Sequence, residues 1–363
     1  MEKILVLNPG STSTKIAYFD GDKELWHESI SHDRSELSGF DSICDQLDFR
    51  YDLILKCMEA HGVTLKDVDA VAARGGPIAP LHHGAYEVND AMEEVIRTHP
   101  LDRHASLLGA LLANRIEHAA GIPSYIYDAV SVNEMLPVCR ISGVPALPRV
   151  ALIHNLNMRA AALRLCREKG WNYHKKTIIV SHLGGGISVS LHHNGTIIDM
   201  VSDEDGPFAP ERAGLLPVSF VLDMIDRGEI DGRGVRRLIK GEGGLVAWLG
   251  TNDSRKVEQM VEAGDQRAKL VYDAMALGVA RSIGRVAPVV SGKVDAIVLT
   301  GGIAYSDYFT GLIASMVDWI APVTVMPGEN EMQTLAEGVL RVLRGEETAR
   351  TFPDTDGVGE ILL

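Results

Sequence analysis

Short apolar stretches separated by polar and glycine-rich segments give this chain the pattern of a mixed α/β protein. Buried strands typically appear as apolar runs or as alternating apolar and polar residues. Such patterns predict strands at Ile4–Leu7, Lys15–Phe19, Leu25–Ile30, Val68–Ala73, Tyr125–Asp128, Thr177–Ser181, Ile187–Leu191, Thr196–Met200, Asp295–Thr300 and Val323–Met326.

Other segments carry apolar residues at helical spacing. In His104–Ala120 the apolar face ends at Gly121 and Pro123, both of which stop helices. Thr251 or Asn252 is expected to cap a further helix that begins near Asp253. The same pattern predicts helices at Asp45–His61, Ala91–Thr98, Asn157–Lys169, Gln266–Val290 and Glu331–Arg344.

One plan occurs twice along the chain. Ile4–Asp20 and Ile178–Asp199 each contain an apolar strand, a turn rich in Gly or Ser, and an alternating strand. A repeat separated by about half of the 363 residues indicates two similar domains, each with a glycine-containing turn, although two unrelated hairpins could match by chance. We expect domains at residues 1–150 and 151–345, followed by a tail at 346–363.

Charge and composition exclude several classes of protein. A net charge of −14 disfavours nucleic-acid binding, and we interpret the basic cluster Arg233–Lys240 as a solvated helix face. The four cysteines show no CxxC spacing, which indicates free thiols in a reducing cytosol. No signal-peptide pattern and no membrane-spanning apolar run is present. We therefore expect a cytoplasmic protein without a membrane or nucleic-acid partner.

The first repeated turn, Asn8–Lys15 (NPGSTSTK), is suited to binding phosphate. Gly10 permits close approach of a ligand, the hydroxyl groups and amides can donate to phosphate oxygens, and Lys15 adds a positive charge. The spacing is not that of a Walker A loop. By itself, a Ser/Thr-rich hairpin turn is also common in proteins without a phosphate ligand.

The second repeated turn, Ser181–Ser188 (SHLGGGIS), places three glycines directly after a buried strand. Consecutive glycines cost backbone entropy, which is reasonable where a ligand contacts the backbone. His182 is expected to face the same space. Gly301 and Gly302 also follow a strand, at the edge where α/β sheets bind ligands. The alternatives are a plain flexible turn and a close helix–strand contact.

Three further side chains could take part in chemistry. Asp128 follows a predicted strand and Glu331 begins the last helix, and carboxylates in such positions can hold Mg²⁺. His154 follows the apolar stretch Val150–Ile153. Considered one at a time, a lone acid in such a position is more often a helix cap or a surface acid, and a lone histidine is more often a core residue.

Taken in order, seven segments between Ile4 and Arg344 resemble the acetate and butyrate kinase family of the actin, hexokinase and Hsp70 superfamily. The segments are NPGSTSTK, YDAVSVNEM around Asp128, ALIHN around His154, SHLGGGIS, GTND with Arg255, TGGI at Thr300–Ile303, and PGENEMQTLAEG at Pro327–Gly338. The resemblance implies two ribonuclease-H-like or actin-like ATPase domains with mixed sheets flanked by helices and a cleft between them.

The resemblance also implies a function. It implies transfer of the γ-phosphoryl group of ATP to a carboxylate with Mg²⁺ as cofactor, in at least a homodimer. The implied metal ligands are Asn8, Asp128 and Glu331. The implied nucleotide-binding residues are Gly10, Ser11, Thr12, Ser13, Lys15, Gly184, Gly185, Gly186, Asp253, Arg255, Gly301 and Gly302. His154 and His182 are expected to donate to the transferring oxygens, and Arg74 to bind the substrate carboxylate or the transition state.

Within this family the chain looks most like the butyrate kinases, because of RGGPIAP at Arg74–Pro80, RHASLLGAL at Arg103–Leu111 and DGPFAPERAG at Asp205–Gly214. Butanoate is thus the expected acceptor, and acetate, propionate, isobutyrate and phenylacetate are the alternative acceptors. A protein that binds ATP without catalysing a reaction is the alternative from a different functional class. Acetate kinases carry an arginine at the position of Val71 in this chain. They carry a second arginine in the segment that matches Asp203–Gly206, where the nearest arginine of this chain is Arg212. Ala129 replaces a proline usual in butyrate kinases.

Overall fold

The computed structural model describes residues 2–354, which form two compact units. The first unit comprises the chain up to Leu156 together with the segment from Asn330 onward, and the second comprises Asn157–Glu329. The expected division at residues 150 and 345 differs from this one at the C-terminal side. The last helix belongs to the first unit because its apolar residues Leu335, Val339 and Leu340 are buried there.

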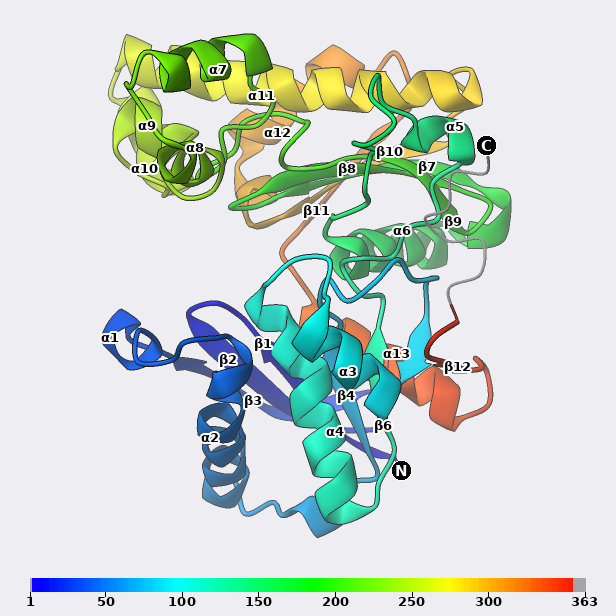
Figure 1. Ribbon diagram of the computed structural model, residues 1–363. Coiled ribbons are helices and arrows are strands. Elements are labelled where there is room, and N and C mark those ends of the chain that lie inside the picture. The colour runs from blue at the N-terminus through cyan, green and yellow to red at the C-terminus, as the bar shows by residue number, and fades with distance from the viewer. Residues whose placement is uncertain (1, 355–363) are drawn as a thin grey trace. The chain divides into compact units, whose positions relative to one another are not determined.

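The first unit is built on a seven-stranded mixed sheet with the order β12-β5-β6-β4-β1-β2-β3 (Figure 1). Its strands are β1 (Lys3–Pro9), β2 (Ser13–Asp20), β3 (Lys23–Ser31), β4 (Ala70–Arg74), β5 (Ala85–Glu87), β6 (Ser124–Tyr127) and β12 (Arg350–Thr351). Its helices are α1 (Arg34–Leu37), α2 (Leu47–Ala60), α3 (Asp90–Thr98), α4 (Leu108–Ala120), α5 (Pro137–Arg140) and α13 (Glu331–Leu343).

Strand β1 shows how the sequence pattern covers both faces of this sheet. Successive side chains of a strand point to opposite faces. Leu5 and Leu7 pack in the cluster that contains α2 and α4, whereas Ile4 and Val6 pack in the cluster that contains α13. The continuous apolar run of β1 is therefore the pattern of a strand that is buried on both faces.

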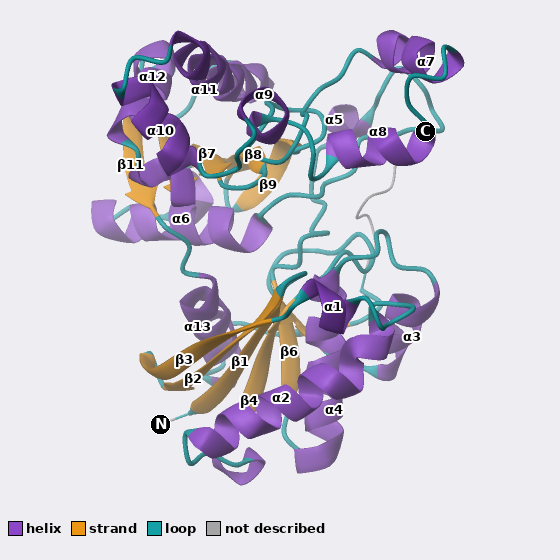
Figure 2. Cartoon of the chain, turned by 90° about the vertical axis from the view of Figure 1, so that its left-hand side faces the viewer, coloured by secondary structure: helices purple, strands orange, loops and turns teal. Residues whose placement is uncertain are grey.

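The second unit contains a five-stranded sheet with the order β11-β10-β7-β8-β9 (Figure 2). Its strands are β7 (Thr177–Leu183), β8 (Ile187–His193), β9 (Thr196–Val201), β10 (Ala296–Gly301) and β11 (Val323–Pro327). Its helices are α6 (Asn155–Lys169), α7 (Val218–Asp226), α8 (Gly232–Ile239), α9 (Leu245–Leu249), α10 (Ser254–Glu262), α11 (Gln266–Val286) and α12 (Asp307–Val317).

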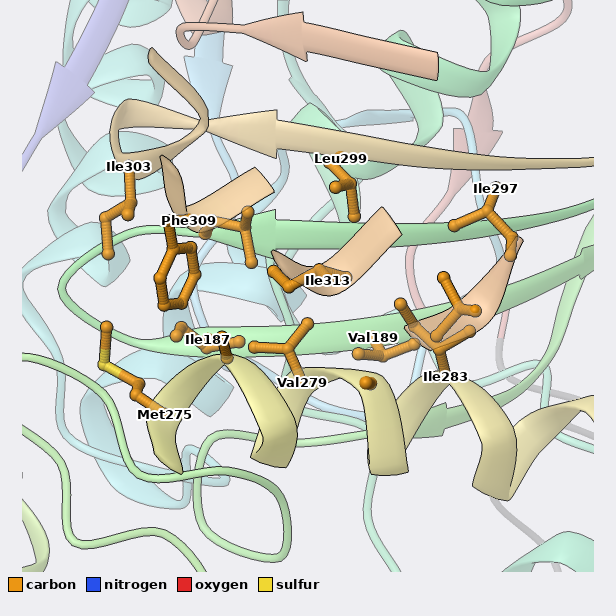
Figure 3. Close-up of a cluster of buried hydrophobic side chains, with 14 of the residues drawn as sticks. Ile187, Val189, Met275, Val279, Ile283, Ile297, Leu299, Ile303, Phe309 and Ile313 are labelled. Carbon is orange, nitrogen blue, oxygen red and sulfur yellow. The ribbon is translucent and has the colours of Figure 1, made fainter. Parts of the chain in front are cut away.

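The core of the second unit lies between one face of this sheet and helices α11 and α12 (Figure 3). Met275, Val279 and Ile283 recur at intervals of four residues along α11, so they form one stripe. This stripe faces Ile187 and Val189 of β8. All five side chains are 0% exposed, as expected of a close-packed interior.

The two sheets repeat one topology. In each, an antiparallel meander, β1-β2-β3 or β7-β8-β9, is extended by two parallel strands beside its first strand, β4 and β6 or β10 and β11. Helices connect the parallel strands, since a parallel crossover cannot be made by a tight turn. This arrangement confirms the repeat inferred from the sequence, and it confirms the predicted class of two mixed sheets flanked by helices.

Local predictions were confirmed in most places and wrong in a few. The cap of α10 is Asp253, whose side chain accepts from the amide of Arg255, and not Thr251 or Asn252. Arg233, Arg236 and Arg237 of the basic cluster lie exposed on α8, as interpreted, and Lys240 follows the helix. Short strands β5 and β12, which pair with each other, were not predicted because two or three residues give no readable period. Within residues 2–354, every helix is either too short or too polar to span a lipid bilayer.

Candidate functional site

Three parallel strands of the first unit end side by side and place three candidate residues along one edge of the sheet. Strand β4 pairs in parallel with β1 on one side and with β6 on the other. The register aligns Leu7 with Ala73, and Arg74 with Tyr127. Asn8, Arg74 and Asp128 therefore lie at the carboxyl ends of neighbouring strands, where open α/β sheets bind ligands.

Asn8, Arg74 and Glu331 contact one another at this edge. The Asn8 amide donates to Glu331 Oε2 at 2.6 Å, while Arg74 Nη1 lies 3.4 Å from Asn8 Oδ1 and 3.4 Å from Glu331 Oε1. The side chains of Arg74 and Glu331 are 20% and 12% exposed. Arg74 and Glu331 thus form an ion pair that keeps some access to solvent and that Asn8 contacts on both sides.

Asp128 has a left-handed backbone conformation. Its φ is 41°, in the left-handed region that residues other than glycine seldom adopt. The Oδ1 atom accepts a hydrogen bond of 2.9 Å from the Gly84 amide, and the residue is 3% exposed. Strained conformations of this kind cluster at functional sites, so this outlier supports a role for Asp128 beyond packing.

The first glycine-containing turn presents donors to solvent. The Gly10 amide donates to the Ser13 carbonyl at 2.8 Å, which closes the turn, and Ser11 and Thr12 are exposed. Lys15 is opposite Asn8 in the β1–β2 pairing, so the two side chains share one face of the hairpin. The turn, Lys15 and the Asn8–Arg74–Glu331 cluster thus lie together in the first unit.

The second turn, Gly184–Gly186, lies between β7 and β8 of the second unit. A side chain at Gly184 would meet His182 Nε2 at 2.8 Å, and one at Gly301, whose φ is 94°, would meet the Leu183 carbonyl oxygen at 2.5 Å. These two glycines are therefore required by close backbone and ring approach. Gly185 is exposed, with no atom near the place of a side chain.

His182 lies at this turn, almost completely buried and held from both sides of its ring. Its Nδ1 is 2.7 Å from the Asn157 amide nitrogen, and its Nε2 is 3.3 Å from Glu329 Oε1. Because the amide donates to Nδ1, the neutral ring carries its proton on Nε2. His182 therefore directs its N–H donor away from Asn157 and toward Glu329 Oε1.

The remaining candidates lie as follows. His154 is half-buried directly before α6. Asp253 and Arg255 pair with each other at 3.1 Å, with Arg255 largely exposed, at the start of α10. Gly302 follows β10 at the start of a short 3-10 turn. Arg212 pairs with Asp203 at 3.1 Å, and Asp203 lies against Gly186, so the arginine is joined to the second turn.

Three residues near these candidates were missed by the sequence reasoning. Asn157 and Glu329 contact His182, and Arg50 contacts the first turn. Asn157 and Glu329 lie close to recognised segments, but no spacing rule relates them to His182. Arg50 belongs to α2, far from the turn in sequence, and a single arginine in a helix gives no signal of burial.

Comparison with known proteins finds similarity in part of the sequence and in the fold. Residues 165–309 match the sequence model of the acetokinase family. The fold matches an acetate kinase from Porphyromonas gingivalis with a TM-score of 0.79, at 18% identity over 94% of this chain and 100% of that one.

Two other solved structures are similar. A propionate kinase from Francisella tularensis has a TM-score of 0.77, at 17% identity over 93% of this chain and 99% of that one. An acetate kinase from Entamoeba histolytica has a TM-score of 0.75, at 15% identity over 93% and 98%. The two-unit fold is thus that of the acetate kinases. The predicted class of enzyme, a phosphotransferase with a carboxyl group as acceptor, agrees with the family match over residues 165–309 and with this fold.

Proposed function

We propose that this protein is a carboxylate kinase that transfers the γ-phosphoryl group of ATP to a short-chain fatty acid, with butanoate as the acceptor. The observation that carries the proposal is the contact between Asn8, Arg74 and Glu331 at the ends of the parallel strands, next to a turn rich in donors. The second unit adds a glycine turn with a positioned histidine.

The residues present fit a magnesium ion. Mg²⁺ prefers oxygen ligands and usually keeps several waters, with one or two carboxylates and substrate phosphates. Glu331, Asp128 and Asn8 offer such oxygens. In the part of the chain that the structure describes, no three His, Cys, Asp or Glu side chains are grouped as a complete metal site, which agrees with a metal held partly by the nucleotide. Bound Mg²⁺ would neutralise charge on the phosphates.

Phosphoryl transfer requires alignment of two anions and neutralisation of charge more than covalent chemistry by the protein. In this proposal Arg74 binds the acceptor carboxylate, and its polar contacts with Asn8 and Glu331 are long, at 3.4 Å. His182 donates from Nε2 to a transferring oxygen in place of Glu329, because Asn157 holds the other ring nitrogen. His154 is proposed as a second donor.

The nucleotide contacts are proposed from the family resemblance. Gly10–Ser13 with Lys15, and Gly184–Gly186, are proposed to bind the β- and γ-phosphates through amides, hydroxyls and one cation. Asp253, Arg255, Gly301 and Gly302 are proposed to contact the nucleoside. The mutual ion pair of Asp253 and Arg255 would have to open or to present its exposed guanidinium to the nucleotide.

The choice of butanoate is supported by the sequence segments at Arg74–Pro80 and Asp205–Gly214. An assay with ATP, Mg²⁺ and hydroxylamine, which traps acyl phosphates, tests it against acetate, propionate, butanoate, isobutyrate, valerate and phenylacetate. A maximum at the four-carbon acids supports the proposal, and a maximum elsewhere keeps the chemistry and changes the acceptor. Absence of hydroxamate from folded protein that binds ATP would favour a non-catalytic ATP-binding protein instead.

We also propose that the protein is a cytoplasmic homodimer or higher homo-oligomer. Helix α7 supports this proposal, because Val218, Phe220 and Leu222 are 71%, 66% and 54% exposed. A helix whose apolar side chains are this exposed is typical of a surface that another protein covers. The net charge of −14 argues against nucleic acid as the partner.

A further inference from the structure

Arg50 of α2 is a fully buried cation in direct contact with the first glycine-containing turn. The residue is 0% exposed. Its Nη1 atom donates to the carbonyl oxygens of Gly10 at 2.9 Å and Ser13 at 3.0 Å, and to Thr14 Oγ1 at 2.9 Å. Its Nε and Nη2 atoms donate to Gln46 Oε1 at 3.1 and 2.9 Å. Each of these acceptors is neutral.

The positive charge of Arg50 is not neutralised by a carboxylate. Within residues 2–354, no ion pair includes this residue. Burial lowers the pKa of Arg50 to about 10, so the guanidinium remains charged at neutral pH. A buried charge without a counter-ion is unfavourable for folding, and such groups are retained where another interaction or a function offsets the cost.

The contacts of Arg50 also determine which way the carbonyl and amide groups of the first turn point. The protein engages the carbonyl oxygens of Gly10 and Ser13 through Arg50, and that of Thr12 through the His32 amide at 2.9 Å. The amides of Ser11 and Thr12 find no acceptor in the described part of the chain, and both residues are exposed. A turn with its carbonyls held inward and its amides outward is an arrangement that binds anions.

The nearby His32 adds no second positive charge beside Arg50. His32 Nε2 is 2.8 Å from Thr14 Oγ1, whose oxygen already accepts from Arg50. Burial first, and then the charge of Arg50, lower the pKa of His32, which favours the neutral ring. Arg50 is thus a cation whose side-chain neighbours Gln46, Thr14 and His32 are neutral.

We propose that Arg50 is a positioning residue for the phosphate chain of the nucleotide, acting through the carbonyls of Gly10 and Ser13 and through its own unneutralised charge. The inference rests on the proposed function, because it takes the polyphosphate as the anion at the first turn. It adds a residue that does not itself touch the ligand.

Gln46→Glu tests the proposal, because it keeps an acceptor for Arg50 and adds the missing counter-ion. We expect ADP affinity to fall on the order of tenfold and adenosine affinity to stay unchanged, with equal or higher thermal stability. Gln266→Glu, an exposed change at the start of α11, adds the same charge as a control and should leave both affinities unchanged. Isothermal titration calorimetry on the full chain with ADP and adenosine gives the readout.

Equal ADP-to-adenosine affinity ratios in Gln46→Glu and Gln266→Glu would overturn the role of Arg50 while leaving the proposed function intact. Wild-type protein that binds neither ATP nor ADP would remove the proposed function and this inference with it. If Gln46→Glu does not fold, Arg50→Lys and Arg50→Met give a second comparison. The lysine should keep the ratio and the methionine lose it about tenfold, and equal ratios in the two variants would overturn the inference.

Discussion

At the scale of single residues, Arg74 is held less tightly than the two residues that it contacts. Arg74 reaches Asn8 and Glu331 only through contacts of 3.4 Å, at the long end for a hydrogen bond, whereas Asn8 and Glu331 are joined at 2.6 Å. The short contact fixes the amide and the carboxylate, whereas the guanidinium is held only by long contacts.

Arg74→Ala and His182→Ala should each lower turnover by at least ~10²-fold in protein that stays folded, because each removes a donor to the reacting anions. Steady-state kinetics in the hydroxamate assay measure the loss, and circular dichroism verifies the fold. Arg97→Ala removes an exposed arginine that pairs with Glu93 on α3 and serves as the control. Wild-type turnover in either site variant would exclude that residue from the mechanism.

At the scale of elements, charged groups join the starts of the neighbouring strands β7 and β10. Asp295 comes directly before β10 and accepts from the Thr177 amide at 2.8 Å and from Lys176 Nζ at 2.7 Å, at the start of the neighbouring strand β7. Partial burial of this carboxyl opposes ionisation, but the hydrogen bonds from Lys176 and Thr177 prevail and lower the pKa of Asp295.

Asp295→Asn should therefore destabilise the protein by about 1–2 kcal/mol at neutral pH. A carboxyl with a lowered folded-state pKa stabilises above its unfolded pKa, and this contribution is lost as the pH falls through the folded value. The difference between wild type and variant should thus shrink toward acid pH. Urea unfolding at neutral and acid pH measures it. Asp318→Asn, at an exposed position after α12, is the control; a pH-independent difference for Asp295→Asn would contradict the assignment.

Helix α7 gives a second prediction at this scale. Phe220→Glu places a charge in its exposed apolar surface and should shift the protein from a dimer to a monomer in sedimentation experiments. Trp319→Glu changes a side chain that is 78% exposed elsewhere in the second unit and should leave the mass unchanged. A wild-type monomer would refute the proposed oligomer, and a dimeric Phe220→Glu would place its interface on another surface.

At the scale of the whole molecule, the chain builds one unit from a continuous segment and the other from two separate segments. The second unit uses Asn157–Glu329 alone, while the first needs α13 from the end of the chain. Leu335, Val339 and Leu340 of α13 are 0–1% exposed and cover the face that carries Ile4 and Val6. Without α13 this face would be open to water.

A fragment of residues 157–329 should therefore fold by itself, and a fragment of residues 1–156 should not. Burial of three aliphatic side chains contributes about 5–9 kcal/mol, comparable with the total stability of a domain. Circular dichroism with urea titration measures cooperative unfolding of each fragment. Residues 1–156 joined by a flexible linker to 330–354 should regain the transition, and a cooperative transition in 1–156 alone would contradict the role of α13.

The sequence by itself determined most of the elements and both turns. Apolar runs, helical spacing and the Gly, Ser and Thr turns are local signals, because they depend on backbone propensity and on which face is buried. They predicted the β1–β2 and β7–β8 hairpins and the long helix α11. They did not predict β5 and β12, whose pairing joins residues far apart in the chain.

Only the tertiary structure decided which side chains meet. Asn8 and Glu331 are 323 positions apart, and no periodicity relates them before the sheet and α13 assemble. The same holds for Arg50 and the turn that it contacts, since burial of a helix arginine depends on what packs over it. Sequence patterns report local geometry, whereas a site depends on distant segments brought into contact by burial of apolar surface.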